Sequence, residues 1–388
     1  MGDQAVPAGQ IGISTGVAML QITTALPEDY RTDSPEHLAE RIRAAKDALG
    51  DRLLILGHHY QKDEVMDWAD ARGDSFGLSR LAADRADAAY VVFCGVHFMA
   101  ESADILTGPD QQVILPDLAA GCSMADMADI DQVEEAWAEI AAVTDISRVV
   151  PITYMNSTAA LKAFVGRHGG AVCTSSNCAS VLEWALAEQP YRPAADKVLF
   201  FPDQHLGRNT AIAMGFDPAS MQVWDPRRDL GGLEDAEVKE ATFLLWKGHC
   251  SVHQRFRTEH VAAFRAAHPT GRVVVHPECA REVVAVADSS GSTDFIIREV
   301  EAAPPGSVFG IGTEIHLVKR LANEHPELVI ECLDPDVCPC TTMSRIDAPH
   351  LAWVLEELVQ GRVRNRIAVD NATAADARVA LERMLSIS

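Results

Sequence analysis

Nine cysteines are spread along the 388-residue chain, and some of them lie beside glycine or proline in sequences typical of turns. Cys122 and Cys250 each follow closely on a glycine, and Cys338-Pro-Cys340 forms the only close pair. Glycine and proline beside a ligand let the backbone approach a bulky inorganic group. Zinc sites normally show Cys-x-x-Cys pairs, which this chain lacks. Isolated ligands from distant segments instead suit a metal site built where domains meet.

An iron–sulfur cluster held by three thiolates leaves one iron without a protein ligand, and that iron can act as a Lewis acid toward a substrate oxygen. The alternative for any single cysteine is a buried, unreactive thiol, because free cysteine packs like a small hydrophobic residue. Spacing alone leaves both interpretations open. Four further cysteines are predicted to be core residues of this kind: Cys94, Cys173, Cys178 and Cys279.

Residues that can donate, accept or hold protons follow three predicted strands. The candidates come after the apolar runs 53–56, 149–152 and 273–275, and they are His58, Tyr60, Tyr154, Asn156, His276 and Glu278. The proline between His276 and Glu278 holds the two side chains apart at a set angle. Glu278 can carry protons if burial raises its pKa. The structural alternatives are packed histidines and a carboxylate that caps a helix.

Short turns rich in hydroxyl groups precede several predicted helices. They contain Ser75, Ser176 and Thr293, and Asn156 lies in a similar turn. Such residues most often cap a helix, but a helix N-terminus also binds carboxylates or phosphates. The formal net charge is −23, from 33 basic and 56 acidic residues. Neutral hydroxyl donors therefore reconcile an acidic chain with an anionic substrate.

Charge and hydrophobicity argue against several classes of function. Nucleic-acid and anionic-membrane surfaces need clustered Lys and Arg, which a net charge of −23 disfavours. No stretch reaches the roughly 18 to 20 apolar residues of a membrane span, and the first residues lack the basic region of a signal peptide. We expect a cytoplasmic enzyme, because scattered free thiols suit a reducing compartment.

The chain alternates between short apolar runs and longer segments with helical periodicity. This order predicts α/β layers with parallel sheets, in which polar turns at the carboxyl ends of the strands bind ligands. The predicted strands are 53–56, 90–93, 112–115, 149–152, 198–201, 273–275, 307–309, 328–330 and 366–369. The predicted helices are 35–49, 131–143, 180–188, 259–267, 315–324, 351–359 and 374–385. Ser34 is the predicted cap of the first helix, and Gly50 its end.

Together these segments resemble the quinolinate synthase family, iron–sulfur enzymes of de novo NAD biosynthesis. The matching strings run in order from about residue 38 to about residue 346: LGHHYQ, GDS, FCGVHFMAE, LPDLAAGCSMAD, YMNSTAALKA, CTSSN, FFPDQHLGRNTA, WKGHCSVH, HPEC, SGST, GTE and Cys-x-x-Met. The resemblance implies three similar three-layer α/β domains with parallel sheets around a pseudo-threefold axis, with the active site at their junction. The implied limits are an N-terminal extension at 1–35, domain 1 at 36–121 completed by the helices of 341–388, domain 2 at 122–249 and domain 3 at 250–340.

The resemblance also implies a reaction and a cofactor. Iminoaspartate and dihydroxyacetone phosphate would condense to quinolinate, with loss of phosphate and two waters, at a [4Fe–4S] cluster that acts as a Lewis acid. Cys122 and Cys250 match two cluster ligands of the family. The third is Cys340, which Met343 follows at the family's spacing, or its competitor Cys338. The implied catalytic residues are Glu278, His276, Tyr60 and Tyr154, and the implied substrate-binding residues are His58, Ser75, Asn156, Ser176, His253 and Thr293.

Some expectations and alternatives remain beside this set. His59 stands where the family is expected to have asparagine, so it is left out of the implied site. A transient contact with L-aspartate oxidase is expected, whereas nucleic acid and membranes are not expected partners. The competing hypotheses are another hydro-lyase with a three-cysteine [4Fe–4S] cluster, a non-catalytic iron–sulfur sensor, and a zinc enzyme that uses His58, His253 and His276.

Overall fold

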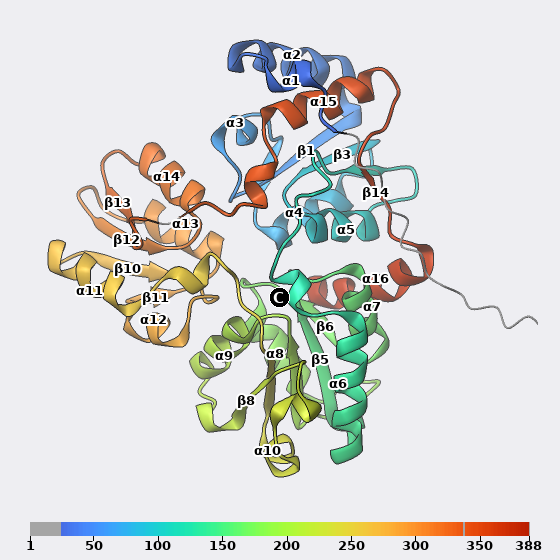
Figure 1. Ribbon diagram of the computed structural model, residues 1–388, viewed down its shortest axis with the longest axis vertical. Helices are drawn as coiled ribbons and strands as arrows, with labels where there is room; N and C mark the ends of the chain where they lie inside the picture. The colour runs from blue at the N-terminus through green and yellow to red at the C-terminus, as the bar shows by residue number, and fades with distance from the viewer. Residues whose placement is uncertain (1–24, 337, 388) are drawn as a thin grey trace, which may run out of the picture.

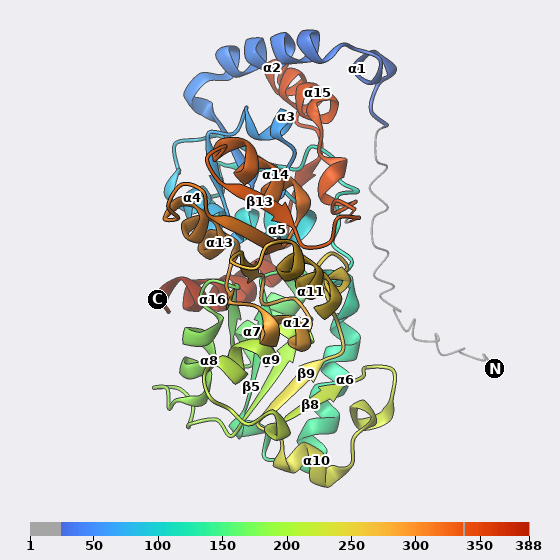
Figure 2. The ribbon, with the colours of Figure 1, turned by 90° about the vertical axis from the view of Figure 1, so that its left-hand side faces the viewer.

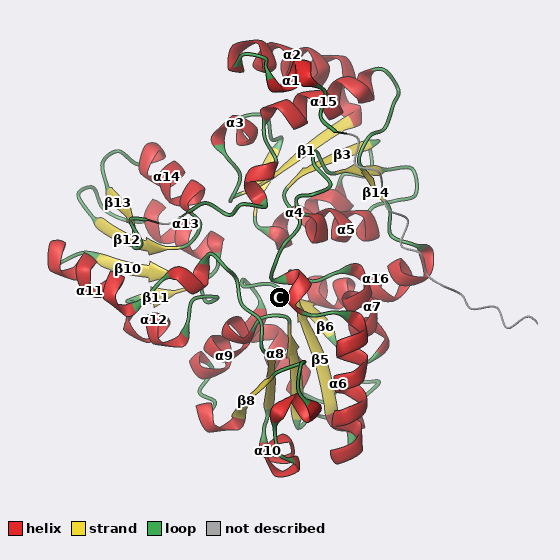
Figure 3. Cartoon of the chain, viewed as in Figure 1, coloured by secondary structure: helices red, strands yellow, loops and turns green. Residues whose placement is uncertain are grey.

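The computed structural model describes residues 25–336 and 338–387, which form three α/β units around a common centre (Figure 1). Each unit contains one mainly parallel sheet with helices on both of its faces (Figure 3). The predicted fold class, three similar α/β layers with parallel sheets, is therefore confirmed.

The first unit contains a five-stranded sheet in the order β14-β4-β3-β1-β2, parallel except for the edge strand β14. Its strands are β1 (Leu53–His58), β2 (Ala71–Gly73), β3 (Tyr90–Cys94), β4 (Gln112–Ile114) and β14 (Arg366–Ile367). Its helices are α1 (Glu28–Arg31), α2 (Pro35–Leu49), α3 (Asp63–Met66), α4 (Ser75–Asp84), α5 (His97–Leu106) and α15 (Ala348–Val359).

The second unit has the strand order β6-β5-β7-β9-β8, and the third has the order β11-β10-β12-β13. The strands of the second are β5 (Val149–Tyr154), β6 (Ala171–Cys173), β7 (Lys197–Phe201), β8 (Met221–Trp224) and β9 (Phe243–Trp246), and its helices are α6 (Ile130–Val143), α7 (Ala159–Arg167), α8 (Cys178–Leu186), α9 (Gln204–Ala213) and α10 (Asp235–Glu240). Those of the third are β10 (Arg272–Val275), β11 (Ser289–Ser290), β12 (Val308–Gly312) and β13 (Val329–Cys332), with α11 (Thr258–Ala267), α12 (Arg281–Val286), α13 (Thr293–Glu301) and α14 (Ile315–Glu324).

The three sheets share one local topology. In each, the first strand (β1, β5 or β10) lies between the second strand at the edge (β2, β6 or β11) and the third strand (β3, β7 or β12). The fourth position is held by β4, β9 or β13. Because all these strands are parallel, the turns after their carboxyl ends lie at one edge of each sheet. Equivalent turns from three sheets can therefore meet at the centre of the molecule.

The predicted strands are confirmed where apolar runs are long enough to be buried on both faces. β1 and β5 are buried along their whole length, as the runs at 53–56 and 149–152 predict. The first long helix is also confirmed: Ser34 accepts a hydrogen bond from the backbone of His37, and Gly50 ends the helix with φ of 53°.

Both ends of the described chain pack against the units. In the segment predicted as an extension, residues 1–24 lie outside the described residues, but Tyr30 of α1 is buried and donates to Glu356 of α15. At the other end, α16 (Asn371–Ser386) follows β14 of the first sheet but packs on α7 of the second unit (Figure 2). Gly166 permits this approach, because a Cβ there would lie 2.0 Å from the carbonyl oxygen of Asp376.

The predicted domain limits at 121/122, 249/250 and 340/341 stay predictions. Among the described residues, no helix combines the length and the hydrophobicity needed to cross a bilayer.

Candidate active site

A cavity lies where the three units meet, and twelve of the thirteen predicted site residues line it. They are Cys122, Cys250, Cys340, His58, Tyr60, Ser75, Tyr154, Asn156, His253, His276, Glu278 and Thr293. The remaining predicted residue, Ser176, is not part of the lining. Among the described residues, the lining contains no lysine or arginine, so an anionic ligand would depend on neutral donors and imidazoles.

Equivalent positions after the first strand of each sheet supply half of this set. His58 ends β1, Tyr154 ends β5 and His276 directly follows β10. Two residues further along the chain come Tyr60, Asn156 and Glu278, which also line the cavity. Equivalent turns in the three sheets thus carry side chains of different chemical type.

Each segment that follows a second strand contributes a hydroxyl at an equivalent position, and the second unit adds Thr174 beside it. In the pairing of first and second strands, His58 lies opposite Gly73, and Tyr154 lies opposite Cys173. The lining hydroxyls stand two residues after these partners, at Ser75 and Ser175. In the third sheet Val275 pairs with Ser290, so the next residue, His276, lies level with Gly291. The residue two positions after Gly291 is Thr293.

Ser176 lies one residue beyond this equivalent position. Its side chain is exposed, and its hydroxyl donates to Asp74 Oδ2 at 2.7 Å. Asp74 also caps α4, where it accepts from the backbone of Gly77 at 2.8 Å, and burial raises its pKa. Sequence reasoning missed both Asp74 and Ser175, although the GDS and CTSSN strings contain them.

The three cavity thiols each follow the strand in the fourth position of a sheet. Cys122 comes after β4, Cys250 after β9 and Cys340 after β13. All three are partly exposed. Cys338 is exposed and is not part of the cavity lining. The four cysteines predicted to be core residues are fully or almost fully buried, which confirms that prediction: Cys94, Cys173, Cys178 and Cys279.

The three cavity thiols do not form one compact group of metal ligands. Thiolates bound to one tetrahedral zinc lie about 3.8 Å apart, given bonds of about 2.3 Å. In the part of the chain that the structure describes, the one group of three possible ligands lying within 4.8 Å of one another is Cys250, His253 and Glu278. The three thiol sulfurs therefore do not all lie within 4.8 Å of one another. Burial raises the pKa of Cys122 to about 12, so metal binding must displace a thiol proton.

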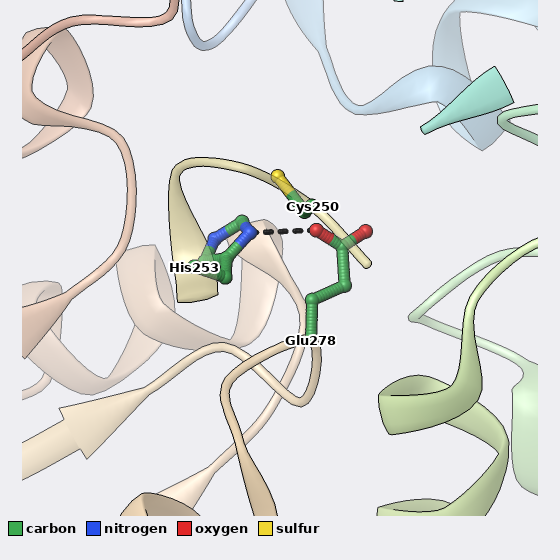
Figure 4. A group of neighbouring side chains, drawn as sticks. All are labelled: Cys250, His253 and Glu278. Atoms are coloured by element: carbon green, nitrogen blue, oxygen red, sulfur yellow. Dashed lines mark ion pairs between the residues drawn. The ribbon is translucent and has the colours of Figure 1, made fainter. Parts of the chain in front are cut away.

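A buried cluster of two imidazoles and a carboxylate forms one wall of the cavity. His253 Nδ1 lies 2.6 Å from Glu278 Oε2, and the two groups face each other directly (Figure 4). His276 stacks on His253 with ring centroids 4.6 Å apart, and its Nδ1 lies 3.8 Å from the same carboxylate oxygen.

The pKa of Glu278 is lowered, so the condition under which this carboxyl would carry protons as an acid is not met. Burial alone would raise this pKa, but His253, 2.6 Å away, and the phenol of Tyr154 outweigh burial and lower it. Glu278 is therefore an anion at neutral pH. It can accept a hydrogen bond from a neighbouring imidazole, but it has no proton of its own to donate.

Two other imidazoles of the site are neutral. Burial lowers the pKa of His58 to about 3 and that of His276 to about 3. Each accepts a hydrogen bond at Nδ1 from the backbone N–H two residues later, from Tyr60 at 3.2 Å and from Glu278 at 3.3 Å. Because an acceptor nitrogen carries no proton, the ring proton of each lies on Nε2.

Hydroxyl groups surround the phenol of Tyr60. Thr293 donates to it at 3.2 Å, and the buried Thr313 hydroxyl lies 2.9 Å from it. Burial and, next, the charge of Glu278 raise the pKa of Tyr60 well above its usual value. Sequence reasoning assigned no role to Thr313, although the GTE string contains it.

His59 lies apart from this set. Its Nε2 is 3.3 Å from Asp294 Oδ1, its carbonyl accepts from Arg320, and it does not line the cavity.

A sequence model of the family described as quinolinate synthetase A protein matches residues 40–386. The chain belongs to the quinolinate synthase family. The quinolinate synthase of Corynebacterium glutamicum is 57% identical over 362 residues, which cover 93% of this chain and 90% of the relative. That of a Nocardioides species is 58% identical over 362 residues, 93% and 92% of the two chains. That of Geobacillus kaustophilus is 53% identical over 368 residues, 94% and 97%. Membership in the quinolinate synthase family thus extends over all three units.

Proposed function

We propose that this chain synthesises quinolinate by condensing iminoaspartate with dihydroxyacetone phosphate, releasing phosphate and two waters. One observation carries the proposal: three thiols, one from each repeated sheet topology, converge on a cavity that Tyr60, Tyr154 and Glu278 also line. The names of the relatives support the same activity.

The three cavity thiols, Cys122, Cys250 and Cys340, are the proposed ligands of a [4Fe–4S] cluster. Their partial exposure and wide spacing support this assignment. Cys338 is the weaker candidate, because it is exposed and lies outside the lining. When bound, such a cluster supplies an iron without a protein ligand, which can polarise a substrate oxygen or nitrogen.

The substrate anions would be held by uncharged donors. Ser75, Ser175 and Thr293 occupy equivalent turns, and Asn156 adds an amide to the same cavity. Hydrogen bonds from neutral groups to a charged acceptor are stronger than bonds between two neutral groups. For the second unit, the geometry supports Ser175 in the role first assigned to its neighbour Ser176.

The His253–Glu278 pair would handle protons during dehydration and tautomerisation. The Glu278 carboxylate accepts and cannot donate, so the proton between the two groups lies on His253 Nδ1. Tyr60 and Tyr154 keep their protons, because burial and the Glu278 charge raise the pKa of both. These phenols therefore do not serve as bases.

Anaerobic purification followed by metal analysis and turnover tests the proposal. We expect about four irons and four sulfides per chain, and quinolinate formation from the two substrates. Loaded protein that forms no quinolinate would contradict the activity.

A second candidate function is a zinc-dependent enzyme, favoured by the close grouping of Cys250, His253 and Glu278. One thiolate, one imidazole and one carboxylate are all zinc ligands. Stoichiometric zinc without sulfide, in protein purified without oxygen, would select this candidate and remove the cluster assignment.

A further inference from the structure

The loops that present the three cavity thiols share one backbone turn. In each loop the carbonyl oxygen of the cysteine accepts from the backbone N–H four residues later, at 3.1 Å for Cys122, 2.9 Å for Cys250 and 2.9 Å for Cys340. A bond with this spacing closes one α-turn. The segment that follows each thiol is therefore held in the same way in all three units.

The segment that precedes each thiol is held differently in the third unit. In the first two units, the helix after the third strand donates a backbone N–H to the carbonyl two residues before the cysteine. His97 of α5 donates to Ala120 at 2.8 Å, and Gln204 of α9 donates to Gly248 at 3.1 Å. In the third unit, no backbone hydrogen bond joins α14 to the described residues 338–340.

A side chain, Glu314, makes the corresponding link in the third unit. Its Oε1 accepts from the backbone N–H of Cys340 at 3.1 Å, and the residue is fully buried. Glu314 also caps α14, because its Oε2 accepts from the backbone N–H of His316 at 2.7 Å. The His316 ring lies against the same carboxyl group, with Nδ1 3.0 Å from Oε1. One carboxyl group thus joins the start of a helix to the loop of a cavity thiol.

The equivalent residue of the second unit, Asp203, is a helix cap without this additional link. Strand pairing places Asp203 and Glu314 at equivalent positions, two residues after the ends of β7 and β12. Asp203 is also fully buried, and it accepts from the backbone of His205 and Leu206 in α9. Among the described residues, its shorter side chain makes no hydrogen bond to the loop of Cys250. Capping therefore does not require the longer side chain of Glu314.

We propose that Glu314 is a positioning residue for the third cluster ligand: it holds the backbone of Cys340 so that this thiol stays at the cavity. Cys338, two residues earlier, is exposed and lies outside the lining. The Glu314 link thus favours one member of the cysteine pair over the other. This inference rests on the proposed function, because it takes the cavity thiols as ligands of a [4Fe–4S] cluster.

Two substitutions separate the link to the loop from the helix cap. Glu314→Asp keeps a preferred capping residue but shortens the side chain by one methylene, so we expect it to lose the contact with Cys340. Glu314→Gln keeps the length and one acceptor oxygen, which can still face Cys340. Asp203→Ser is the matched control, because it also shortens a fully buried cap while it keeps a preferred capping residue.

The experiment measures iron and acid-labile sulfide in anaerobically purified chains, and then the rate at which an iron chelator removes the cluster. For Glu314→Asp we expect loss about tenfold faster than in the unsubstituted chain, the effect of one buried hydrogen bond. The rate should stay within about threefold for Glu314→Gln and within about twofold for Asp203→Ser. Quinolinate formation per loaded cluster should not change, because Glu314 is not part of the cavity lining.

Equal rates of cluster loss in Glu314→Asp and the unsubstituted chain would overturn the positioning role. So would an equal acceleration in Asp203→Ser, since this would indicate a general effect of shortened caps. If Glu314→Asp holds no iron after purification, Glu314→Gln decides the question: retained iron supports the role, and complete loss there too would overturn it.

The iron and sulfide readouts do not depend on turnover, so the two proposals can fail separately. An unsubstituted chain that holds the cluster but forms no quinolinate would contradict the proposed activity and leave the Glu314 result valid. An unsubstituted chain that holds no cluster would overturn both.

Discussion

The turn after β1 and the turn after β10 use the same backbone device at equivalent places in two sheets. In each, a buried histidine accepts the backbone N–H of the residue two positions later: His58 from Tyr60, and His276 from Glu278. In each, burial lowers the pKa of the imidazole to about 3. The two turns differ in the residue that they present to the cavity.

Because these residues are Tyr60 and Glu278, one turn presents a proton donor and the other presents an anion. Burial raises the pKa of Tyr60 well above its usual value, so the phenol keeps its proton. Burial would also raise the pKa of Glu278, but the adjacent His253 outweighs it and lowers that pKa. The strand-end turn thus fixes where a side chain lies, and the neighbours from other elements decide its charge.

The largest expected effect comes from removing the charge of the second turn. Glu278→Gln keeps the size of the side chain but cannot hold the His253 proton as an anion does. We expect quinolinate formation to fall by about a hundredfold or more, with iron and sulfide content unchanged. Near-normal turnover of the loaded variant would remove Glu278 from the proton-handling pair.

A smaller loss is expected from the first turn. Tyr60→Phe removes a donor but leaves the His253–Glu278 pair in place. Turnover should fall by about tenfold, the effect of losing one hydrogen bond in a buried site. Steady-state kinetics on cluster-loaded protein provide the measurement. A loss equal to that of Glu278→Gln would contradict the assignment of a hydrogen-bond donor to the first turn and a proton-handling anion to the second.

The shared feature of the two turns predicts a pH dependence of stability. The pKa of His58 and His276 is about 3 in the folded chain and about 6.5 when unfolded. The unfolded chain therefore binds more protons between these values. Each imidazole contributes stability that is present above about pH 6.5 and is lost as the pH falls, by up to about 1.4 kcal/mol per pH unit.

Denaturant unfolding between about pH 5 and about pH 6.5 measures this slope. His58→Asn and His276→Asn should each flatten it by a similar amount. An unchanged slope in either variant would show that its histidine does not contribute to the pH dependence of stability as the other one does.

The smallest effect is expected next to the first turn. His59 faces Asp294 at 3.3 Å, and its link to Arg320 uses its backbone carbonyl, which any residue retains. His59→Asn should change kcat by less than about twofold and the free energy of unfolding by less than about 1 kcal/mol. A tenfold loss of kcat would place His59 in the site after all.

The parts of the fold that the sequence predicts are those with long apolar runs. β1, β5 and β10 are rich in Leu, Ile and Val, so the residues that follow them could be assigned to the carboxyl edge of a sheet. The second strands, β2, β6 and β11, have only three, three and two residues and lack such runs. They escaped prediction for that reason.

The missed details of the site have non-local causes. The choice of Ser175 over Ser176 depends on the pairing of β5 with β6, in which Tyr154 lies opposite Cys173. Thr313 acquires its partners only where the third unit meets the turn of the first. The lowered pKa of Glu278 depends on His253, which lies 25 residues earlier in the chain.

Iron and acid-labile sulfide per chain in Cys338→Ser and Cys340→Ser, purified without oxygen, test the central claim most directly. The claim is that one thiol from each repeated sheet topology reaches a common cavity. It predicts that Cys340→Ser loses the cluster, whereas Cys338→Ser retains about four irons and four sulfides. A Cys340→Ser variant with its cluster intact, beside a Cys338→Ser variant without one, would contradict it.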